Sequence, residues 1–371
     1  MSDFKIGILG GGQLARMLAL RGFELGAQVH IYSESSNDPA AQVTRFSHQG
    51  KSDSTSDLKK FLKEVGVATF ESEFMDAALL AKLSKETDTN IFPAPELMGK
   101  IQDRLSQKEL LIKNKVPTTP YIAVANAEDL EKAFEEFGPF VLKKRRFGYD
   151  GNGTFVCKDA KGLASLALMI DSEEYGWIAE KFVKFKRELA CVIVRSSDGS
   201  IADLPIVETH QEDSRCLWVK GPIKTNTRLT ALGTNLRKFL KNIDYVGAMG
   251  FEIFETEYDL IINELAPRVH NSGHYSMNAL SEDQFSLHMK AVAGLRISSP
   301  LLLSAGFAMY NLIGSSKDTP QWSDIPDGVS FHWYGKTENR PGRKMGHMNA
   351  LGTTPEAALT TLKIARRKFD V

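Results

Sequence analysis

Residues 250–274, GFEIFETEYDLIINELAPRVHNSGH, alternate apolar and acidic positions on both sides of a short polar turn. This alternation predicts two strands that pair as a hairpin around residues 257–259. In that hairpin, Glu252 and Glu264 would lie within about a residue of direct cross-strand register. Opposed like charges destabilise a sheet, and hard cations prefer oxygen ligands, with phosphates completing the shell. The segment therefore predicts a magnesium–ATP site, unless one of the two acids faces solvent.

Polar groups continue directly after the second of these strands. Arg268, His270 and Asn271 follow it within a few residues, which favours a substrate or anion site. His270 and His274 are four residues apart, a spacing that can bind zinc on a helix. Pro267 argues against that helix, so we do not predict zinc.

A second informative segment is the glycine run at residues 10–12. It lies between an apolar run at 4–9 and a helical pattern, and it fits G-x-G-x-x-A with Ala15 in the last position. Glu34 ends the next predicted strand, where a ribose-binding acid would lie in a dinucleotide site. Taken alone, this favours NAD or FAD, but the same turn also binds simple phosphates.

A basic strand is predicted at residues 140–146, followed by the loop GYDGNG. Alternate side chains of a strand point to opposite faces, so Lys143 can reach phosphates while Lys144 and Arg146 meet solvent. The N–H groups of the glycine-rich loop can close over a triphosphate. The alternative is a solvated charge run with a hairpin loop.

Two further segments are less distinctive. Residues 178–183, IAEKFV, with Glu188 beyond them, place acids where adenine and ribose could be bound, although exposed acids at a strand end are common. Residues 334–347 hold several cations in a loop rich in glycine, which suits phosphate recognition but is also typical of an exposed basic loop. Helices are predicted near residues 100–114 and 162–171.

Composition limits the kinds of partner. The chain has 371 residues, which is too long for one compact core. Its 46 Lys and Arg balance its 46 Asp and Glu, so charge gives no reason to expect a nucleic acid or a membrane surface. The 3 cysteines are far apart, and no apolar stretch approaches the roughly 18 residues of a membrane span. We expect a cytoplasmic protein.

Several motifs occur in a specific order: GGGQL, Asp103-Arg104-x3-Lys108, KxRR-x-GYDG, AEKFVxFxRELA, NELAPRxHNSGH and RPGRKMGH. In this order they resemble the N5-carboxyaminoimidazole ribonucleotide synthase family of ATP-grasp enzymes, over nearly the whole chain. The resemblance implies an α/β fold, α+β in part. It divides the chain into a Rossmann-like pre-ATP-grasp domain (1–98), an ATP-grasp domain (99–297, with a lid at about 115–185) and a small β-rich C-terminal domain (298–371).

The resemblance also implies the activity. ATP would phosphorylate bicarbonate to carboxyphosphate, whose CO₂ is transferred to the exocyclic amine of 5-aminoimidazole ribonucleotide in purine biosynthesis. Glu252 and Glu264 would bind Mg²⁺ or Mn²⁺. The implied catalytic residues are Arg268, Lys143 and Asp150. The implied ATP-binding residues are Arg104, Lys143, Gly148, Tyr149, Asp150, Gly151, Gly153, Glu180, Lys181, Phe182, Val183, Glu188, Asn263 and Glu264. The implied nucleotide-binding residues are Gly12, Gln13, Leu14, Glu73, Asp150, Arg268, His270, Asn271, Lys336, Arg343 and Lys344. Members of the family are often homodimers.

Three positions depart from the family pattern. Phe147 replaces the first of two glycines, Phe74 follows Glu73 where an asparagine is usual, and Gln211 occupies a position where a histidine is expected. Three other functions stay open at this point. The chain could be a related ATP-grasp ligase acting on a different amine, a nicotinamide-dependent oxidoreductase, or a non-catalytic nucleotide sensor.

Overall fold

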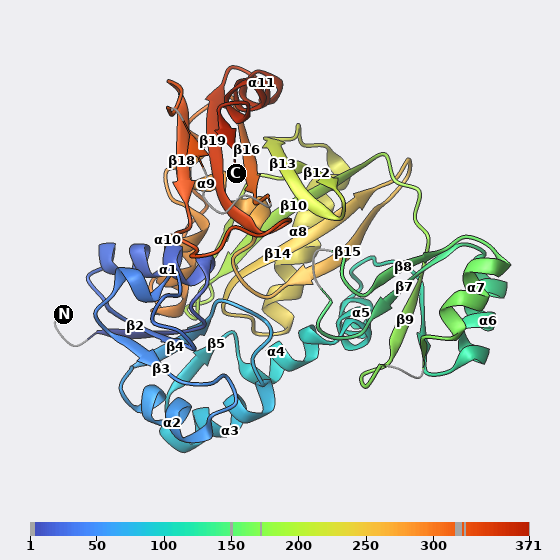
Figure 1. Ribbon diagram of the computed structural model, residues 1–371, viewed down its shortest axis with the longest axis horizontal. Coiled ribbons are helices and arrows are strands. Elements are labelled where there is room, and N and C mark those ends of the chain that lie inside the picture. Colours follow the sequence, from blue (N-terminus) through green and yellow to red (C-terminus); the bar gives the residue numbers. More distant parts are fainter. Residues whose placement is uncertain (1–3, 149–150, 171–172, 316–320, 323, 371) are drawn as a thin grey trace.

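The computed structural model describes residues 4–148, 151–170, 173–315, 321–322 and 324–370. Its N-terminal part is a five-stranded parallel sheet in the order β3-β2-β1-β4-β5, at the lower left of Figure 1. The strands are β1 (Lys5–Leu9), β2 (Gln28–Ser33), β3 (Ser47–Gln49), β4 (Val67–Phe70) and β5 (Asn90–Phe92). The associated helices are α1 (Gln13–Glu24), η1 (Ala41–Val43), α2 (Thr55–Lys63) and α3 (Ala77–Thr87). The predicted βαβ opening is confirmed.

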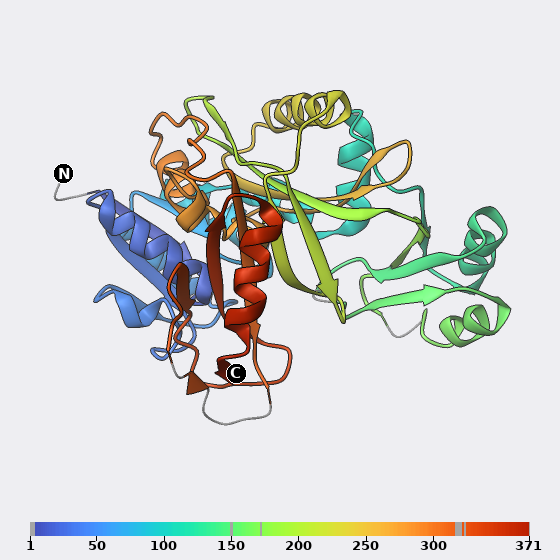
Figure 2. The same ribbon diagram turned by 90° about the horizontal axis from the view of Figure 1, so that it is seen from above.

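A small antiparallel sheet stands away from the rest of the molecule at the right of both Figure 1 and Figure 2. Its order is β6-β9-β7-β8, and α6 and α7 pack on it. Its elements are β6 (Tyr121–Val124), α6 (Ala127–Phe137), β7 (Phe140–Lys144), β8 (Thr154–Cys157), α7 (Ala160–Ala167) and β9 (Trp177–Lys181). We call it the lid sheet. The strand predicted at 140–146 therefore ends at Lys144, and the helix predicted at 162–171 begins and ends earlier.

The central sheet has nine antiparallel strands, in the order β15-β14-β10-β12-β13-β16-β19-β18, with β11 beside β10. These are β10 (Arg187–Arg195), β11 (Ile201–Asp203), β12 (Val207–Glu212), β13 (Arg215–Gly221), β14 (Gly247–Glu255), β15 (Leu260–Ala266), β16 (Gly306–Ile313), β18 (Val329–Trp333) and β19 (Lys344–Gly352). The last three come from the C-terminal part of the chain, so that part extends the central sheet. A pair of short strands, β17 (Gln321–Trp322) and β20 (Phe369–Asp370), lies outside it.

Helices join the central sheet to its neighbours. They are α8 (Thr227–Asn242), η3 (Asn271–Gly273), α9 (Ser276–Ala279), α10 (Gln284–Val292) and α11 (Pro355–Arg366). One apolar cluster runs from Leu18 of α1 through Phe285 of α10 and Val192 of β10 to Phe307 of β16. Burying this shared surface stabilises the N-terminal sheet against the central one. In the part of the chain that the structure describes, no helix is long and apolar enough to cross a membrane.

The prediction of a single helix at 100–114 is wrong. Asp103 separates two helices there, α4 (Pro95–Gln102) and α5 (Arg104–Lys113). Asp103 is extended and accepts a hydrogen bond from the Leu105 N–H, as an N-cap residue does. Its carboxylate also pairs with the Arg145 guanidinium, at 2.6 and 3.0 Å. This break begins α5 at Arg104 and joins it to the loop that leaves β7.

Candidate active site

Two acids face each other across the β14–β15 hairpin. Glu252 and Glu264 are direct cross-strand partners, with a register irregularity between Glu252 and Ile253, so the predicted pairing is confirmed. Arg104 lies 2.7 Å from Glu264 Oε2, and Asn263 Nδ2 donates to Glu252 Oε2 at 3.4 Å. Burial and the facing Glu264 together raise the pKa of Glu252. The two carboxylates repel each other, yet the fold keeps them together. Together they make an oxygen-rich donor set that suits Mg²⁺ or Mn²⁺.

A buried cation–carboxylate cluster lies beside this pair. Glu180 Oε2 is 3.1 Å from both Lys143 Nζ and Lys108 Nζ. Lys143 also donates to Asn263 Oδ1, and Lys108 donates to the Thr118 hydroxyl. The other carboxylate oxygen of Glu180 is buried and has no hydrogen-bond partner among the described residues. Such an oxygen is expected to accept from a ligand, because an unpaired buried acceptor is costly.

Lys108 belongs to the cluster although the sequence predicts no role for it. Its side chain is only 1% exposed, and burial lowers its pKa to about 8. Burying a lysine is costly unless a carboxylate pairs with it, as Glu180 does here. The signal in the sequence was the spacing Arg104-x3-Lys108, which places both cations on one side of α5.

Replacing Glu180 with Gln should lower the free energy of unfolding at neutral pH by about 3 kcal/mol, because two buried ammonium groups lose their carboxylate. Burial favours the neutral acid, but Lys143 and Lys108 override it and hold the pKa of Glu180 at about 2. The stabilisation is complete above the ordinary value of 4.5 and is lost as the pH falls towards 2. Denaturant unfolding from pH 7 to pH 2 should show the variant's deficit shrinking. Glu135→Gln, an exposed helix position, is the matched control.

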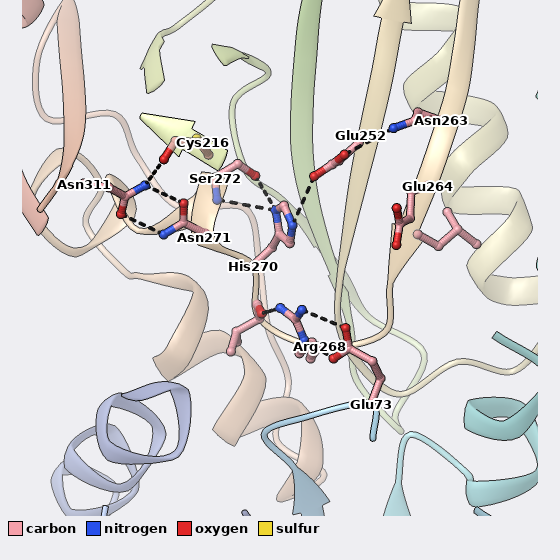
Figure 3. A network of polar contacts seen from close by, with 12 residues as sticks. Glu73, Cys216, Glu252, Asn263, Glu264, Arg268, His270, Asn271, Ser272 and Asn311 are labelled. Carbon is pink, nitrogen blue, oxygen red and sulfur yellow. Dashed lines mark hydrogen bonds and ion pairs between the residues drawn. The ribbon is translucent and has the colours of Figure 1, made fainter. Parts of the chain in front are cut away.

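The Arg268 guanidinium connects the central sheet to the N-terminal sheet. Arg268 Nε and Nη2 both bond the carboxylate of Glu73, with Nη2 to Oε1 at 2.9 Å (Figure 3). Glu73 follows β4, 195 residues away in sequence. Burial raises the pKa of Glu73, but Arg268 outweighs it and the net shift is downward. Both predicted nucleotide-binding groups are therefore charged and positioned by each other.

His270 and Asn271 form a second polar group next to Arg268, as Figure 3 shows. His270 Nδ1 lies 2.8 Å from the Ser272 hydroxyl, and Nε2 lies 3.6 Å from Glu252. Burial, and then the positive charge of Arg268, lower the pKa of His270 to about 3, so the ring is neutral. Asn271 exchanges two amide hydrogen bonds with Asn311 of β16, at 2.7 and 3.0 Å. Asn311 was missed in the sequence, because nothing local links it to this loop.

The glycine turn before α1 is occupied by a carboxylate from the chain itself. Glu71 accepts from the N–H groups of Gly12 (3.0 Å) and Ala15 (3.3 Å). A Cβ on Gly10 or Gly12 would lie 2.2 or 2.6 Å from the Glu71 side chain, which explains why glycine is required at both positions. Any phosphate at this turn must use the other groups around it. This role of Glu71 is not predicted by its sequence context.

The basic loop before β19 docks on the N-terminal part. Gln42 Nε2 donates to the Gly335 carbonyl at 2.9 Å. Lys336 Nζ donates to the Lys344 carbonyl at 2.6 Å, and Arg343 donates to the Glu338 carbonyl at 3.0 Å. The loop therefore contacts the segment that follows β2 and lies beside Arg16 of α1.

Family models match nearly the whole chain. The ATP-grasp domain matches residues 109–285, the ribonucleotide synthetase preATP-grasp domain matches 3–102, and the phosphoribosylaminoimidazole carboxylase C-terminal domain matches 308–361. N5-carboxyaminoimidazole ribonucleotide synthase of Synechococcus elongatus is 37% identical over 354 residues, covering 92% of this chain and 88% of that protein. The chain belongs to the N5-carboxyaminoimidazole ribonucleotide synthase family.

Solved structures agree with this assignment. The N5-carboxyaminoimidazole ribonucleotide synthetase of Thermus thermophilus has a TM-score of 0.89 at 32% identity, with 98% of each chain covered. The Aspergillus clavatus enzyme, in complex with ADP and 5-aminoimidazole ribonucleotide, has a TM-score of 0.87 at 28% identity, with 99% of each chain covered. The ATP-grasp fold is confirmed, and the chain is an ATP-grasp ligase of this synthase family. The oxidoreductase alternative is therefore not supported, although Glu34 does share a pocket with the glycine turn.

The remaining predicted positions of the synthase site are distributed as follows. Tyr149 and Asp150 lie outside the described residues. Gly151 and Gly153 have φ values of +81° and +76°, which glycine adopts most readily. Gly148 lines a pocket with Arg104 and Glu264. Lys181 ends β9, and Phe182 and Val183 follow it in a more exposed segment. Gln13 and Leu14 begin α1, and Glu188 lies on β10.

Gln211, one of the departures from the family pattern, contacts the predicted ribose-binding acid. Burial raises the pKa of Glu188, and a side-chain hydrogen bond from Gln211 partly offsets this effect. Gln211 lies at a bulge between β12 and β13. The glutamine therefore provides a donor to Glu188 from the neighbouring strand.

Proposed function

We propose that this chain uses ATP and bicarbonate to carboxylate the exocyclic amine of 5-aminoimidazole ribonucleotide. The observation that carries the proposal is the Arg268–Glu73 pair, which brings a cation of the ATP-grasp sheet to an acid of the N-terminal domain beside Glu252 and Glu264. A site of this kind spans two binding regions, one for Mg-ATP and one for an acceptor. A nucleotide sensor has no need of the second region.

The roles of the residues follow from their chemistry. Arg104 and Lys143 would hold the ATP phosphates, and the unpartnered oxygen of Glu180 would accept from adenine. Glu252 and Glu264 would hold Mg²⁺ or Mn²⁺. The chemistry that Mg²⁺ or Mn²⁺ would supply there is positive charge, which offsets the negative charge that develops during phosphoryl transfer. Arg268 would orient bicarbonate, since a guanidinium matches a planar oxyanion with two parallel hydrogen bonds.

The reaction then has three steps. A bicarbonate oxygen attacks the γ-phosphorus and displaces ADP, which forms carboxyphosphate. The bond between carbon and the bridging oxygen breaks, its electron pair stays with phosphate, and CO₂ is released. The amine attacks CO₂, forms the N–C bond and gives a proton to phosphate. Neutral His270 can accept or donate a hydrogen bond to the nucleotide without adding charge.

The decisive test is phosphate release from Mg-ATP and bicarbonate, with and without 5-aminoimidazole ribonucleotide. We expect strong stimulation by that nucleotide. ATP turnover that is indifferent to it would point to an ATP-grasp ligase with a different acceptor amine.

We also propose a cytoplasmic homodimer, which sedimentation at twice the 41.1 kDa of one chain would support.

Lys336→Ala and Arg343→Ala should each raise the KM for the aminoimidazole nucleotide about tenfold or more and leave the KM for ATP nearly unchanged. Both residues belong to the basic loop that docks near the glycine turn, far in sequence from the Glu180 cluster. Loss of one charge-assisted contact to a phosphate is worth about 1.5–3 kcal/mol. Steady-state kinetics with each substrate varied separately measures the effect. Equal changes in both KM values would contradict the assignment.

A further inference from the structure

Three exposed aromatic rings meet where the N-terminal sheet approaches the lid sheet. Phe74 follows β4, Phe147 follows β7 and Tyr175 precedes β9, and their exposed fractions are 45%, 51% and 37%. The ring centroids of Phe74 and Phe147 are 6.2 Å apart, and those of Phe147 and Tyr175 are 5.5 Å apart at an interplanar angle of 71°. Both distances lie in the range of attractive aromatic pairs. We call this group the aromatic rim.

Phe147 keeps its place in the rim at a conformational cost. Its φ is +60°, in the left-handed region that a bulky side chain seldom adopts. A glycine there would avoid the cost, so a phenylalanine indicates that the ring itself is useful. Phe147 and Phe74 are two of the three departures from the family pattern, and the structure joins them in one contact.

Both sides of the rim are anchored to the helices that meet at Asp103. On one side, Arg145 pairs with Asp103, and its carbonyl accepts from the Arg104 N–H at 2.9 Å. On the other side, Gln102 Nε2 donates to the carbonyls of Glu73 and Met75, at 2.6 and 2.8 Å. The chain immediately before Phe147 and around Phe74 is therefore held by α5 and α4.

The rim borders a pocket whose other lining residues include several charged side chains. Phe74 and Phe147 line it together with Glu73, Arg104 and Glu264. These are the groups assigned above to the nucleotide, the ATP phosphates and the metal. Half-exposed aromatic side chains at the edge of such a pocket bring apolar surface to the place where a phosphorylated intermediate would form.

We propose that Phe74 and Phe147 are positioning residues that limit the access of water to carboxyphosphate and so couple ATP cleavage to carboxylation. The inference rests on the proposed function. Water attacking carboxyphosphate returns bicarbonate and phosphate, so that ATP is hydrolysed to ADP without an N–C bond being formed. Excluding water from a site that holds a reactive intermediate prevents this loss. The rim provides apolar surface for that purpose.

The test is the ratio of phosphate released to carboxylated nucleotide formed, with all substrates saturating. The wild type should give a ratio near 1, while Phe74→Ala and Phe147→Gly should each raise it by about threefold or more. The double variant should be little worse than the worse single one, because the two rings form one contact. Phe74→Leu, which restores apolar bulk, should recover part of the coupling. Tyr258→Ala, at an exposed turn position, is the control.

Each contrary result has a definite meaning. If both ring variants keep the wild-type ratio, the rim has no part in coupling, and the proposal is wrong while the proposed function stands. If the ratio returns to the wild-type value at higher nucleotide concentration, the rings serve nucleotide binding instead, and the proposal is again wrong. If the wild type itself shows no response to 5-aminoimidazole ribonucleotide, the proposed function fails, and the inference fails with it.

Discussion

Glu264→Gln is expected to lower turnover by about 10³-fold while the protein stays folded and retains much of its affinity for ADP. Glu264 faces Glu252 across the hairpin and pairs with Arg104, so its carboxylate contributes to both the metal donor set and the phosphate region. An amide is a weaker ligand for a hard cation. The same change removes the repulsion between two carboxylates, so the free energy of unfolding should change by no more than about 1 kcal/mol.

The measurements for Glu264→Gln are phosphate release, calorimetric binding of ADP, and thermal unfolding. Glu257→Gln makes the same chemical change in the exposed turn of the same hairpin and should leave all three unchanged. Phosphate release retained at a tenth of the wild-type rate or more would remove Glu264 from the metal site. Inactivity together with a large loss of stability would show a folding role instead.

The parts of the site that could be predicted from the sequence are those whose partners lie close together along the chain. The alternation at 250–265 determines which faces Glu252 and Glu264 share, because four residues close the hairpin and leave little freedom of register. The start of α1 could be predicted for the same reason, because the glycines and the helical pattern are adjacent in the sequence. Periodicity also has limits, since the helical pattern at 100–114 does not reveal that Asp103 caps a new helix.

The other contacts depend on how distant segments pack. Arg268 and Glu73 are 195 residues apart, and Asn271 and Asn311 are joined only because β16 extends the central sheet. No spacing rule predicts that Glu71 occupies the N-terminus of α1, or that Lys108 shares a carboxylate with Lys143. Resemblance to a family transfers the identity of a residue, but its partners in the folded chain come from tertiary structure.

Arg268→Lys is the second substitution with a large expected effect, a fall in carboxylation of about 10²–10³-fold. Arg268 holds Glu73 with two of its nitrogens, a geometry that an ammonium group cannot reproduce. A lysine keeps the positive charge but leaves one oxygen of the partly buried Glu73 carboxylate without its donor. The variant therefore separates the effect of geometry from the effect of charge.

The affinity of the Arg268→Lys variant for ADP should stay within about threefold of the wild type, because none of the contacts of Arg268 involves Lys143, Glu180 or Lys108. Calorimetry measures that affinity, and product formation at saturating bicarbonate measures the loss of rate. Arg228→Lys, a half-exposed position on α8, is the matched control. A rate within threefold of the wild type would mean that Arg268 acts only as a positive charge beside Glu73. In that case the bidentate pair would serve to hold the N-terminal sheet against the central one, and bicarbonate would have to be oriented by other groups.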